Sequence, residues 1–294
     1  MTGIKKILYL TDFSGPSQLA LPVAVKLARQ YGGSIEVVHV LTPMIPEAYL
    51  EAVEADEELA AAEMKKIESQ IVGAPFTSTT VHESSVWSAV ERAIAEHHID
   101  LIVTGTHGRT GLLKLLLGSV AEEVFRRSPI PVLTVGPHES PGNESTAQDR
   151  SVVFATDFSS GSEAAAPYAF SVAEESRARL ILLHVMRESE PSQPSEFKEY
   201  ENRVAVVIDQ LRRFAPEPSG FAISDPAEVR VEHGDPADRI LAVAKERKAS
   251  LIVLGVRGVE HVDAITHLEL AVAHKVVALA HCPVLTVRAQ VTVL

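Results

Sequence analysis

Cysteine is almost absent from this sequence, because Cys282 is the only one. A single thiol cannot form a disulfide within the chain or supply a metal cluster of several cysteines. A chain without a disulfide framework suits a reducing compartment. Cys282 precedes Pro283 at a predicted strand start, so we expect a small buried residue there.

Positive charge and long apolar runs are also scarce. The 27 Lys and Arg residues face 39 Asp and Glu residues, which gives a net charge of −12. This balance excludes a general DNA or RNA binder, although a nucleotide's charge can still be met locally. No apolar run is long enough to span a membrane, and residues 1–6 lead directly into a strand pattern rather than a signal peptide. We therefore expect a soluble, cytoplasmic protein that does not act at a membrane.

What the sequence does contain is an internal repeat. Residues 7–14 end in Thr-Asp-Phe-Ser, and residues 152–159 end in the same four residues after a shift of 145 positions. Two later pairs of segments also match: 101–105 with 251–255, and 131–135 with 283–287. This period is far longer than a solenoid repeat, so it indicates two copies of one domain. We place the first domain at 1–137, a linker at 138–150 and the second domain at 151–294. The linker is rich in Gly, Pro, Ser and Asn.

Each copy alternates strands and helices. In the first copy we expect strands at 4–10, 35–40, 77–82, 100–104 and 131–135, and helices around 19–28 and at 47–72, 85–97 and 119–127. The strands are continuously apolar, which indicates a parallel sheet covered on both faces. We therefore predict the α/β class, with a five-stranded doubly wound sheet in each half. Ligands of such sheets bind beyond the carboxyl ends of the strands, where Asp12, Val40 and Gly105 fall.

Glycines at fixed spacing follow the fourth strand, in the pattern Gly105-x2-Gly108-x9-Gly118-Ser119. Residues 119–122 fit a capping box, so we expect a helix to begin at Ser119. Free amides at a helix start attract anions, and glycine lets a phosphate approach the backbone. The pattern favours a phosphate site, and the alternative is an ordinary connection whose glycines only serve turns.

This pattern resembles the ATP-binding signature of universal stress proteins. The resemblance extends to residues 5–14, to His39-Val40 and to the last strand at 131–135, and it covers nearly the whole chain as two tandem domains. It implies a Rossmann-like fold of the adenine nucleotide α-hydrolase type. It also implies an ATP-binding regulator of the stress response that acts through conformational or partner changes.

The resemblance also implies a role for individual residues of the first copy. Thr11 and Asp12 would face the adenosine end, and Val40 would pack near the adenine or ribose. The segment past the ribose and α-phosphate would be Thr104, Gly105, Thr106, His107, Gly108 and Arg109. The β- and γ-phosphates would lie against Gly118, Ser119, Val120 and Ala121. The ligand would be ATP, or AMP or ADP, with Mg²⁺ carried on the phosphates because few protein ligands are on offer.

Simpler interpretations stay open for several of these residues. Asp12 fits a turn residue that caps the next helix, and Ser119 fits a plain N-cap. His107 has no evident partner for general-base catalysis. We expect His39 and His184 to be packed histidines, and Trp87 to pack within its helix layer.

The second copy departs from the pattern. Gly255 and Gly258 are kept, but Leu270-Ala271 stand where the first copy has Gly118-Ser119. Thr266-x-x-Glu269 fits a cap for a helix that starts one turn earlier. We therefore predict that the second domain does not bind ATP in the usual way.

Two other classes of function remain as alternatives. One is a slow ATPase or a nucleotidyl or phosphoryl transferase, although the sequence has no P-loop and no evident catalytic base. The other is a binding protein for another small ligand, which would use a second pocket made more apolar by Leu268 and Leu270. The final strands, 131–135 and 283–287, fit exposed edges that seek partners. We expect them to pair within one chain, and a homodimer of two chains stays open.

Overall fold

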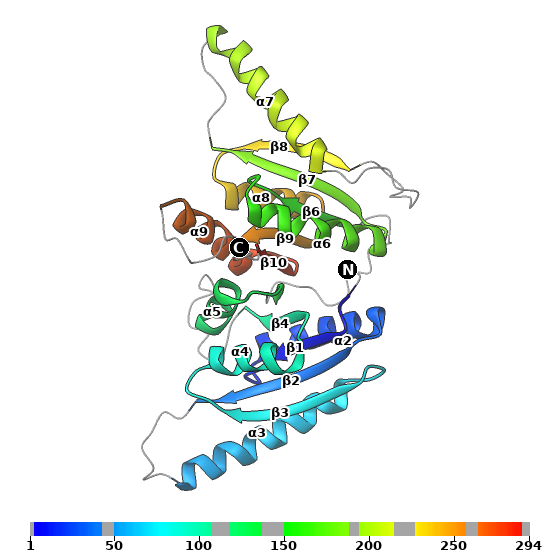
Figure 1. Ribbon diagram of the computed structural model, residues 1–294, viewed down its shortest axis with the longest axis vertical. Coiled ribbons are helices and arrows are strands. Elements are labelled where there is room, and N and C mark those ends of the chain that lie inside the picture. The colour runs from blue at the N-terminus through cyan, green and yellow to red at the C-terminus, as the bar shows by residue number, and fades with distance from the viewer. Residues whose placement is uncertain are drawn as a thin grey trace. The chain divides into compact units, whose positions relative to one another are not determined.

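The computed structural model describes residues 3–42, 50–106, 118–136, 150–187, 194–214, 227–256 and 264–289. The chain divides into two compact units, Thr2–Pro137 and His138–Leu294 (Figure 1). Each unit alternates strands and helices as the repeat predicts, and each is described by itself below.

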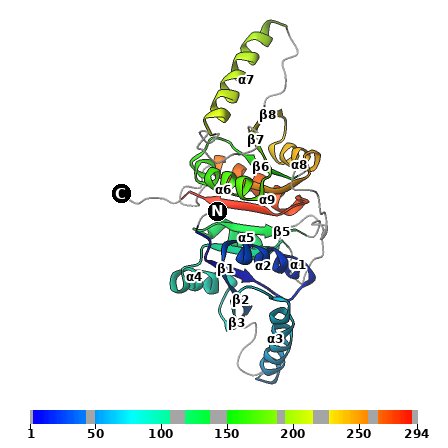
Figure 2. The ribbon, with the colours of Figure 1, turned by 90° about the vertical axis from the view of Figure 1, so that its right-hand side faces the viewer.

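The first unit is a five-stranded parallel sheet in the order β3-β2-β1-β4-β5. Its strands are β1 (Lys6–Leu10), β2 (Ser34–Leu41), β3 (Phe76–His82), β4 (Leu101–Gly105) and β5 (Val132–Val135). Its helices are α1 (Gly15–Gln18), α2 (Ala20–Tyr31), α3 (Leu50–Gln70), α4 (Val86–His97) and α5 (Ser119–Arg127). Right-handed crossovers place α2 and α3 on one face of this sheet and α4 on the other (Figure 2).

The second unit repeats this sheet in the order β8-β7-β6-β9-β10, again with all strands parallel. Its strands are β6 (Ser151–Ala155), β7 (Arg179–Met186), β8 (Glu228–His233), β9 (Ala249–Val256) and β10 (Val284–Arg288). Its helices are α6 (Ser160–Ser176), α7 (Pro194–Phe214), α8 (Pro236–Glu246) and α9 (Ala264–Leu279). The predicted fold class, α/β with two tandem doubly wound domains, is therefore confirmed.

The core lies where the apolar runs predict it. Ile7, Leu8 and Tyr9 on β1 are fully buried, and their repeat partners Val152, Val153 and Phe154 on β6 are fully buried as well. Cys282 and Trp87 are 8% and 5% exposed, which confirms that both are packed residues. Burial also raises the pKa of the Tyr9 hydroxyl to about 12.

One detail differs from the sequence-based expectation. The helix predicted between the first two strands is two helices, because the chain breaks at Leu19 between α1 and α2. Pro22, in the first turn of α2, has no N–H to donate to the carbonyl four residues earlier. In the second unit Pro167 occupies the same repeat position inside a continuous α6, so proline alone does not decide the break.

The glycine at the end of the fourth strand of each unit is required by packing. A Cβ on Gly105 would lie 2.7 Å from the carbonyl oxygen of Pro16 and 2.9 Å from the Cα of Ser17. A Cβ on Gly255 would lie 2.1 Å from the carbonyl carbon of Gly161 in α6. These contacts are with backbone, which cannot move aside as a flexible side chain would. Each glycine therefore lets the first helix of its unit touch the end of the fourth strand, β4 or β9.

Alanine at these two glycines is expected to destabilise the fold. G105A and G255A should each lower the free energy of unfolding by about 1–3 kcal/mol, with the larger loss for G255A because its contact is shorter. Chemical denaturation of the full chain measures this loss. G15A is the matched control, since a Cβ on Gly15 would meet nothing within 4 Å. Equal stability of G105A and G15A would show that the packing argument is wrong.

Candidate functional site

A tight turn follows β1 at the carboxyl edge of the first sheet. The Thr11 hydroxyl accepts a hydrogen bond from the Phe13 amide at 3.0 Å. The Asp12 carboxylate accepts from the Ser14 amide at 3.0 Å and from the Ser14 hydroxyl at 2.6 Å. Phe13 is held in the left-handed region at φ 63° by these bonds. The turn thus fixes the direction in which the chain enters α1.

This turn shows whether Asp12 caps the next helix. The N-cap of α1 is Ser14, whose hydroxyl accepts from the Ser17 amide at 3.2 Å. Asp12 is therefore a turn residue, but it does not itself cap the helix. Its carboxylate remains half-buried at the strand end, where the resemblance puts the adenosine. A contact with a nucleotide stays a prediction for Asp12.

His39 on β2 is a packed residue, as the sequence predicts. It is 5% exposed, its Nδ1 lies 2.8 Å from the Thr11 carbonyl oxygen, and its ring centroid lies 4.1 Å from that of Phe13. Leu10 pairs with Val38 at the end of the β1–β2 ladder, and Asp12 and Val40 each follow these partners by two positions. Val40 is half-buried at the same edge as Asp12, which brings these two predicted site residues together.

The end of β4 is tied directly to the start of α5. Thr106 is fully buried, and its amide donates to the Val135 carbonyl at 3.0 Å. Its own carbonyl accepts from the Gly118 amide at 2.7 Å. This bond brings Thr104–Thr106 and Gly118–Ala121 together at the carboxyl edge. The predicted site residues His107, Gly108 and Arg109 lie outside the described residues.

The helix α5 begins at Ser119 as predicted, but the predicted capping box is wrong. The N-cap is Gly118, in an extended conformation (φ −62°, ψ 143°), and no side chain caps the helix. The Glu122 carboxylate instead accepts from Arg126 at 3.1 Å, one turn further along α5. A glycine cap has no side chain with which to satisfy the first amides.

The start of α5 therefore presents uncapped amides. Within the described part of the chain, the amides of Ser119, Val120 and Ala121 have no hydrogen-bond partner, since a helix cannot satisfy its own first turn. Ser119 and Val120 are exposed. The positive end of the helix dipole adds to the attraction of these donors for an anion. The Gly118 amide, in contrast, is used by Thr106 and does not belong to this set.

The second unit keeps the strand-end turn. Phe158 has φ 64°, Asp157 accepts from the Ser159 amide at 2.9 Å, and His184 lies 2.8 Å from the Thr156 carbonyl oxygen. The Phe158 and His184 rings stack with centroids 4.7 Å apart. The sequence predicted that His39 and His184 are packed. It did not predict that Phe13 and Phe158 pack against them, or that Ser14 and Ser159 cap the following helices. The Thr-Asp-Phe-Ser repeat itself was the signal that could have revealed them.

In the second unit, the positions that match the start of α5 do not lie at a helix start. The helix α9 begins at Ala264, before Thr266, so the predicted cap at Thr266 is wrong. The positions that match Gly118 and Ser119, namely Leu270 and Ala271, lie inside this helix. Amides inside a helix are bonded to carbonyls four residues earlier and are not available to an anion.

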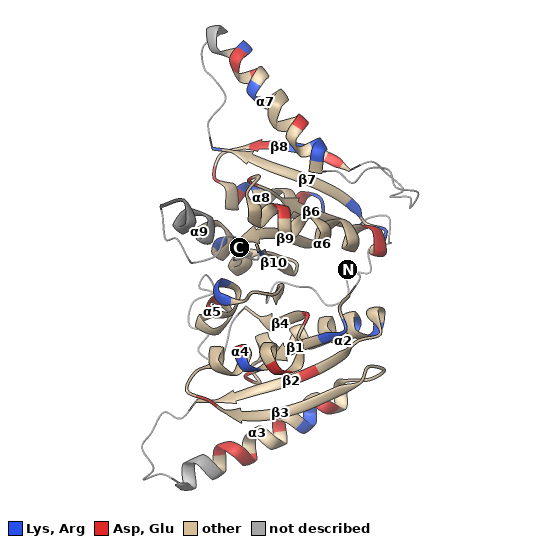
Figure 3. Cartoon of the chain, viewed as in Figure 1, with Lys and Arg blue, Asp and Glu red and all other residues tan. Residues whose placement is uncertain are grey.

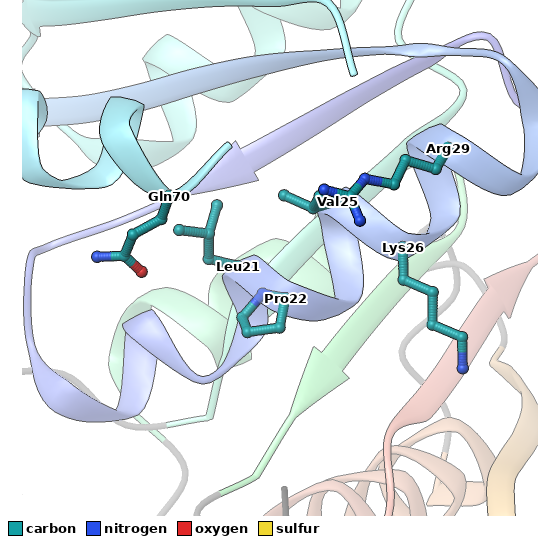
Figure 4. A pocket seen from close by; sticks show the side chains of 6 residues that line it. All are labelled: Leu21, Pro22, Val25, Lys26, Arg29 and Gln70. Carbon is teal, nitrogen blue, oxygen red and sulfur yellow. The ribbon is translucent and has the colours of Figure 1, made fainter. Parts of the chain in front are cut away.

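An open pocket of about 350 Å³ lies between α2 and the end of α3 (Figure 4). Leu21, Val25 and Arg29 of α2 and Gln70 of α3 are among the residues that line it. None of the predicted site residues lines this pocket. It lies in the helix layer rather than at the carboxyl ends of the strands, so it has no part in the candidate site.

Two kinds of feature are absent from the described residues. They contain no group of three or more His, Cys, Asp or Glu side chains placed to hold a metal ion. None of the helices in the described ranges is long and apolar enough to cross a membrane.

Fold and site together define a tandem α/β protein with an anion-attracting helix start at the strand ends of its first domain. The family model described as the universal stress protein family matches residues 3–136 and again residues 150–288. The chain therefore belongs to the universal stress protein family, as a member with two tandem domains.

Individual relatives agree with this assignment. The chain is 26% identical over 266 residues to a universal stress protein of Mycolicibacterium smegmatis, with 86% of this chain and 87% of the relative covered. It is 34% identical over 152 residues to the universal stress protein YxiE of Bacillus subtilis, with 47% of this chain and 97% of the relative covered. The solved structure of a universal stress protein from Archaeoglobus fulgidus matches its fold with a TM-score of 0.67 at 21% identity, over 98% of this chain and all of that one.

The half-buried His184 is expected to make stability depend on pH. Burial lowers the pKa of His184 below its ordinary value near 6.5, although the Thr156 carbonyl and Asp157 act to raise it. The folded state therefore disfavours the proton, so stability present above pH 6.5 is lost as the pH falls. H184N keeps a donor for Thr156 but cannot titrate.

Denaturation from about pH 7.5 to about pH 5.5 tests this expectation. Unfolding free energy should fall more steeply on acidification for the wild type than for H184N. The other histidines are common to both proteins, so the difference in slope reports His184 alone. Parallel curves for the two proteins would contradict the expectation.

Proposed function

We propose that this protein binds one ATP, or another adenine nucleotide, in its first domain and acts as a nucleotide-dependent regulator of the stress response. The observation that carries the proposal is the uncapped start of α5, held beside the end of β4 by the Thr106–Gly118 hydrogen bond. Membership of the universal stress protein family supports the stress-related role.

The polyphosphate would lie against the amides of Ser119, Val120 and Ala121. Three uncapped donors at the positive end of a helix, two of them on the exposed residues Ser119 and Val120, suit a group that carries several negative charges. The Ser119 hydroxyl adds a further donor. Thr11, Asp12 and Val40 would meet the adenosine end at the same edge of the sheet. His107, Gly108 and Arg109 would complete the site as the resemblance implies.

Mg²⁺ would come with the phosphates. Mg²⁺ is commonly bound through a few carboxylates together with the oxygens of a phosphorylated ligand. The described site offers the single carboxylate of Asp12, which already accepts hydrogen bonds from Ser14. These residues therefore suit a metal that is held by the nucleotide rather than by the protein.

The second domain would not bind ATP in this way. The sequence-based prediction relied on the side chains of Leu268 and Leu270, which are not among the side chains that the structure describes. What supports the proposal is the backbone: Ala271 lies inside α9, so its amide faces a helix carbonyl instead of a phosphate. The cytoplasmic location and the pairing of residues 131–135 with 283–287 stay predictions.

Replacing Ser119 by proline tests the role of the amides. S119P removes one donor at the first helical position, where proline is favoured, and the extended Gly118 suits a residue before proline. ATP affinity should fall about 10- to 100-fold, since a hydrogen bond to a charged group contributes about 1.5–3 kcal/mol. S119A keeps the amide and should lose less than about 10-fold, the equivalent of one neutral hydrogen bond.

Trp87 provides the measurement. It is the only tryptophan, it is 5% exposed, and its ring centroid lies 4.8 Å from the Arg127 guanidinium at the end of α5. Its fluorescence should therefore report ligands that bind at α5, with calorimetry as an independent readout. If S119P and S119A lose the same affinity, the hydroxyl is the donor that matters and the amide argument is wrong.

The number of bound nucleotides tests the difference between the two domains. Calorimetric titration of the full chain with Mg-ATP should give one site per chain, and S119P should weaken that same site. Two sites of similar affinity per chain would contradict the proposed loss of binding in the second domain.

A further inference from the structure

The helix α7 of the second unit carries an outer face that its own domain leaves uncovered. Its last turn is anchored, since Leu211 is fully buried and the Phe214 ring lies 5.9 Å from that of Phe154. Towards its start the helix extends past β8, the edge strand of this sheet (Figures 1 and 2). Val206, on the side away from Leu211, is 58% exposed. An exposed apolar side chain in the middle of a projecting helix is a candidate contact point.

The residues around Val206 form one continuous polar face. They lie three, four or seven positions from Val206, which places them on the same side of the helix. All of them are exposed: Glu199, Asn202, Arg203, Asp209, Gln210 and Arg213. Within one helix Glu199 pairs with Arg203 at 3.1 Å, and Asp209 pairs with Arg213 at 2.6 Å. Exposed pairs of this kind hold little energy and can exchange partners.

The order of these charges makes the face complementary to itself. Glu199 and Arg213 lie seven residues before and after Val206, with opposite signs. Arg203 and Asp209 lie three residues before and after it, again with opposite signs. The alternation of acidic and basic segments along α7 is visible in Figure 3. When a second copy of α7 runs antiparallel with Val206 against Val206, each of these four charges therefore meets its opposite.

The matching helix of the first unit has no such arrangement. The helices α3 and α7 are both 21 residues long, and Ala62 stands where α7 has Val206. The positions that match the four charged residues of α7 hold Ala55, Leu59, Lys65 and Ser69. The charge pattern is therefore particular to α7 and does not follow from the fold.

We infer that α7 is a dimerisation helix, which pairs antiparallel with α7 of a second copy of this chain and places Val206 on the two-fold axis. A two-fold contact uses the same patch on both subunits, and this face satisfies that condition by its sequence. The patch is small and its rim is charged, so the association should depend on protein concentration and weaken at high salt. This contact is independent of the nucleotide site at α5.

A disulfide across the axis tests the register. In the full chain with C282A as background, V206C should form a covalent dimer under mild oxidation, because packed helices lie about 8–10 Å apart and residues on the axis face each other. A62C in the same background is the matched control on α3. Cross-linking of V206C no faster than that of A62C would overturn the proposal.

A charge inversion tests the self-complementarity. The variant with E199R, R203E, D209R and R213E keeps both pairs within the helix and should associate with itself within about threefold of the wild-type dissociation constant. Mixed with the wild type it should form few heterodimers, since like charges then face each other. V206E should weaken self-association at least 10-fold, and circular dichroism would show that α7 still forms.

Sedimentation velocity of differently labelled chains measures the self-association of each variant and the formation of heterodimers with the wild type. A wild type that stays monomeric at concentrations up to about 100 µM would overturn the proposal, because a specific interface of even modest affinity is populated there. So would an inverted variant that pairs with the wild type as well as with itself. A dimer that V206E leaves unchanged would place the contact on another surface, such as an exposed sheet edge.

Discussion

The close approach of α1 to the end of β4 is the constraint on which the rest of the first domain depends. It exists because Gly105 has no side chain, so the backbone of Pro16 and Ser17 can touch the strand. That contact holds the turn at Asp12 beside the end of β4. The Thr106–Gly118 hydrogen bond then brings the start of α5 to the same place. One packing contact and one hydrogen bond thus assemble the candidate site from three segments.

A comparison of the two halves distinguishes features that the fold requires from features that belong to the candidate ligand site. Both halves keep the glycine contact, the left-handed phenylalanine and the histidine beneath it, so these features belong to the architecture. Within the described residues, the start of α5 has no side-chain cap, whereas the matching positions of the second half, Leu270 and Ala271, lie inside α9. A ligand that is recognised mainly by backbone amides can be lost by lengthening a helix, without the replacement of a single catalytic group.

Much of this was readable from the sequence. The repeat and the continuous apolar strands predicted two parallel α/β sheets, because the strand period and the burial of both faces leave few other arrangements. The capping box at Ser119 was wrong because spacing alone could not show that Gly118 would take the cap and Glu122 would turn to Arg126. The resemblance placed Gly105 beside the ribose and α-phosphate, which stays a prediction, but the sequence did not show that the backbone of α1 packs against this glycine.

The sequence by itself determined the fold class and the duplication, since these follow from local periodicity and from segments that match between the halves, and it predicted where the candidate site lies. Only the tertiary structure decided which amides near Ser119 are available, because a hydrogen bond from Gly118 to Thr106 depends on two segments meeting in space. It also decided that Val206 is exposed, since the sequence cannot show where α7 leaves its sheet. The residue pattern along the chain determines which helices and strands form. Contacts between segments that are distant in the sequence determine which of their groups stay accessible to a ligand or a partner.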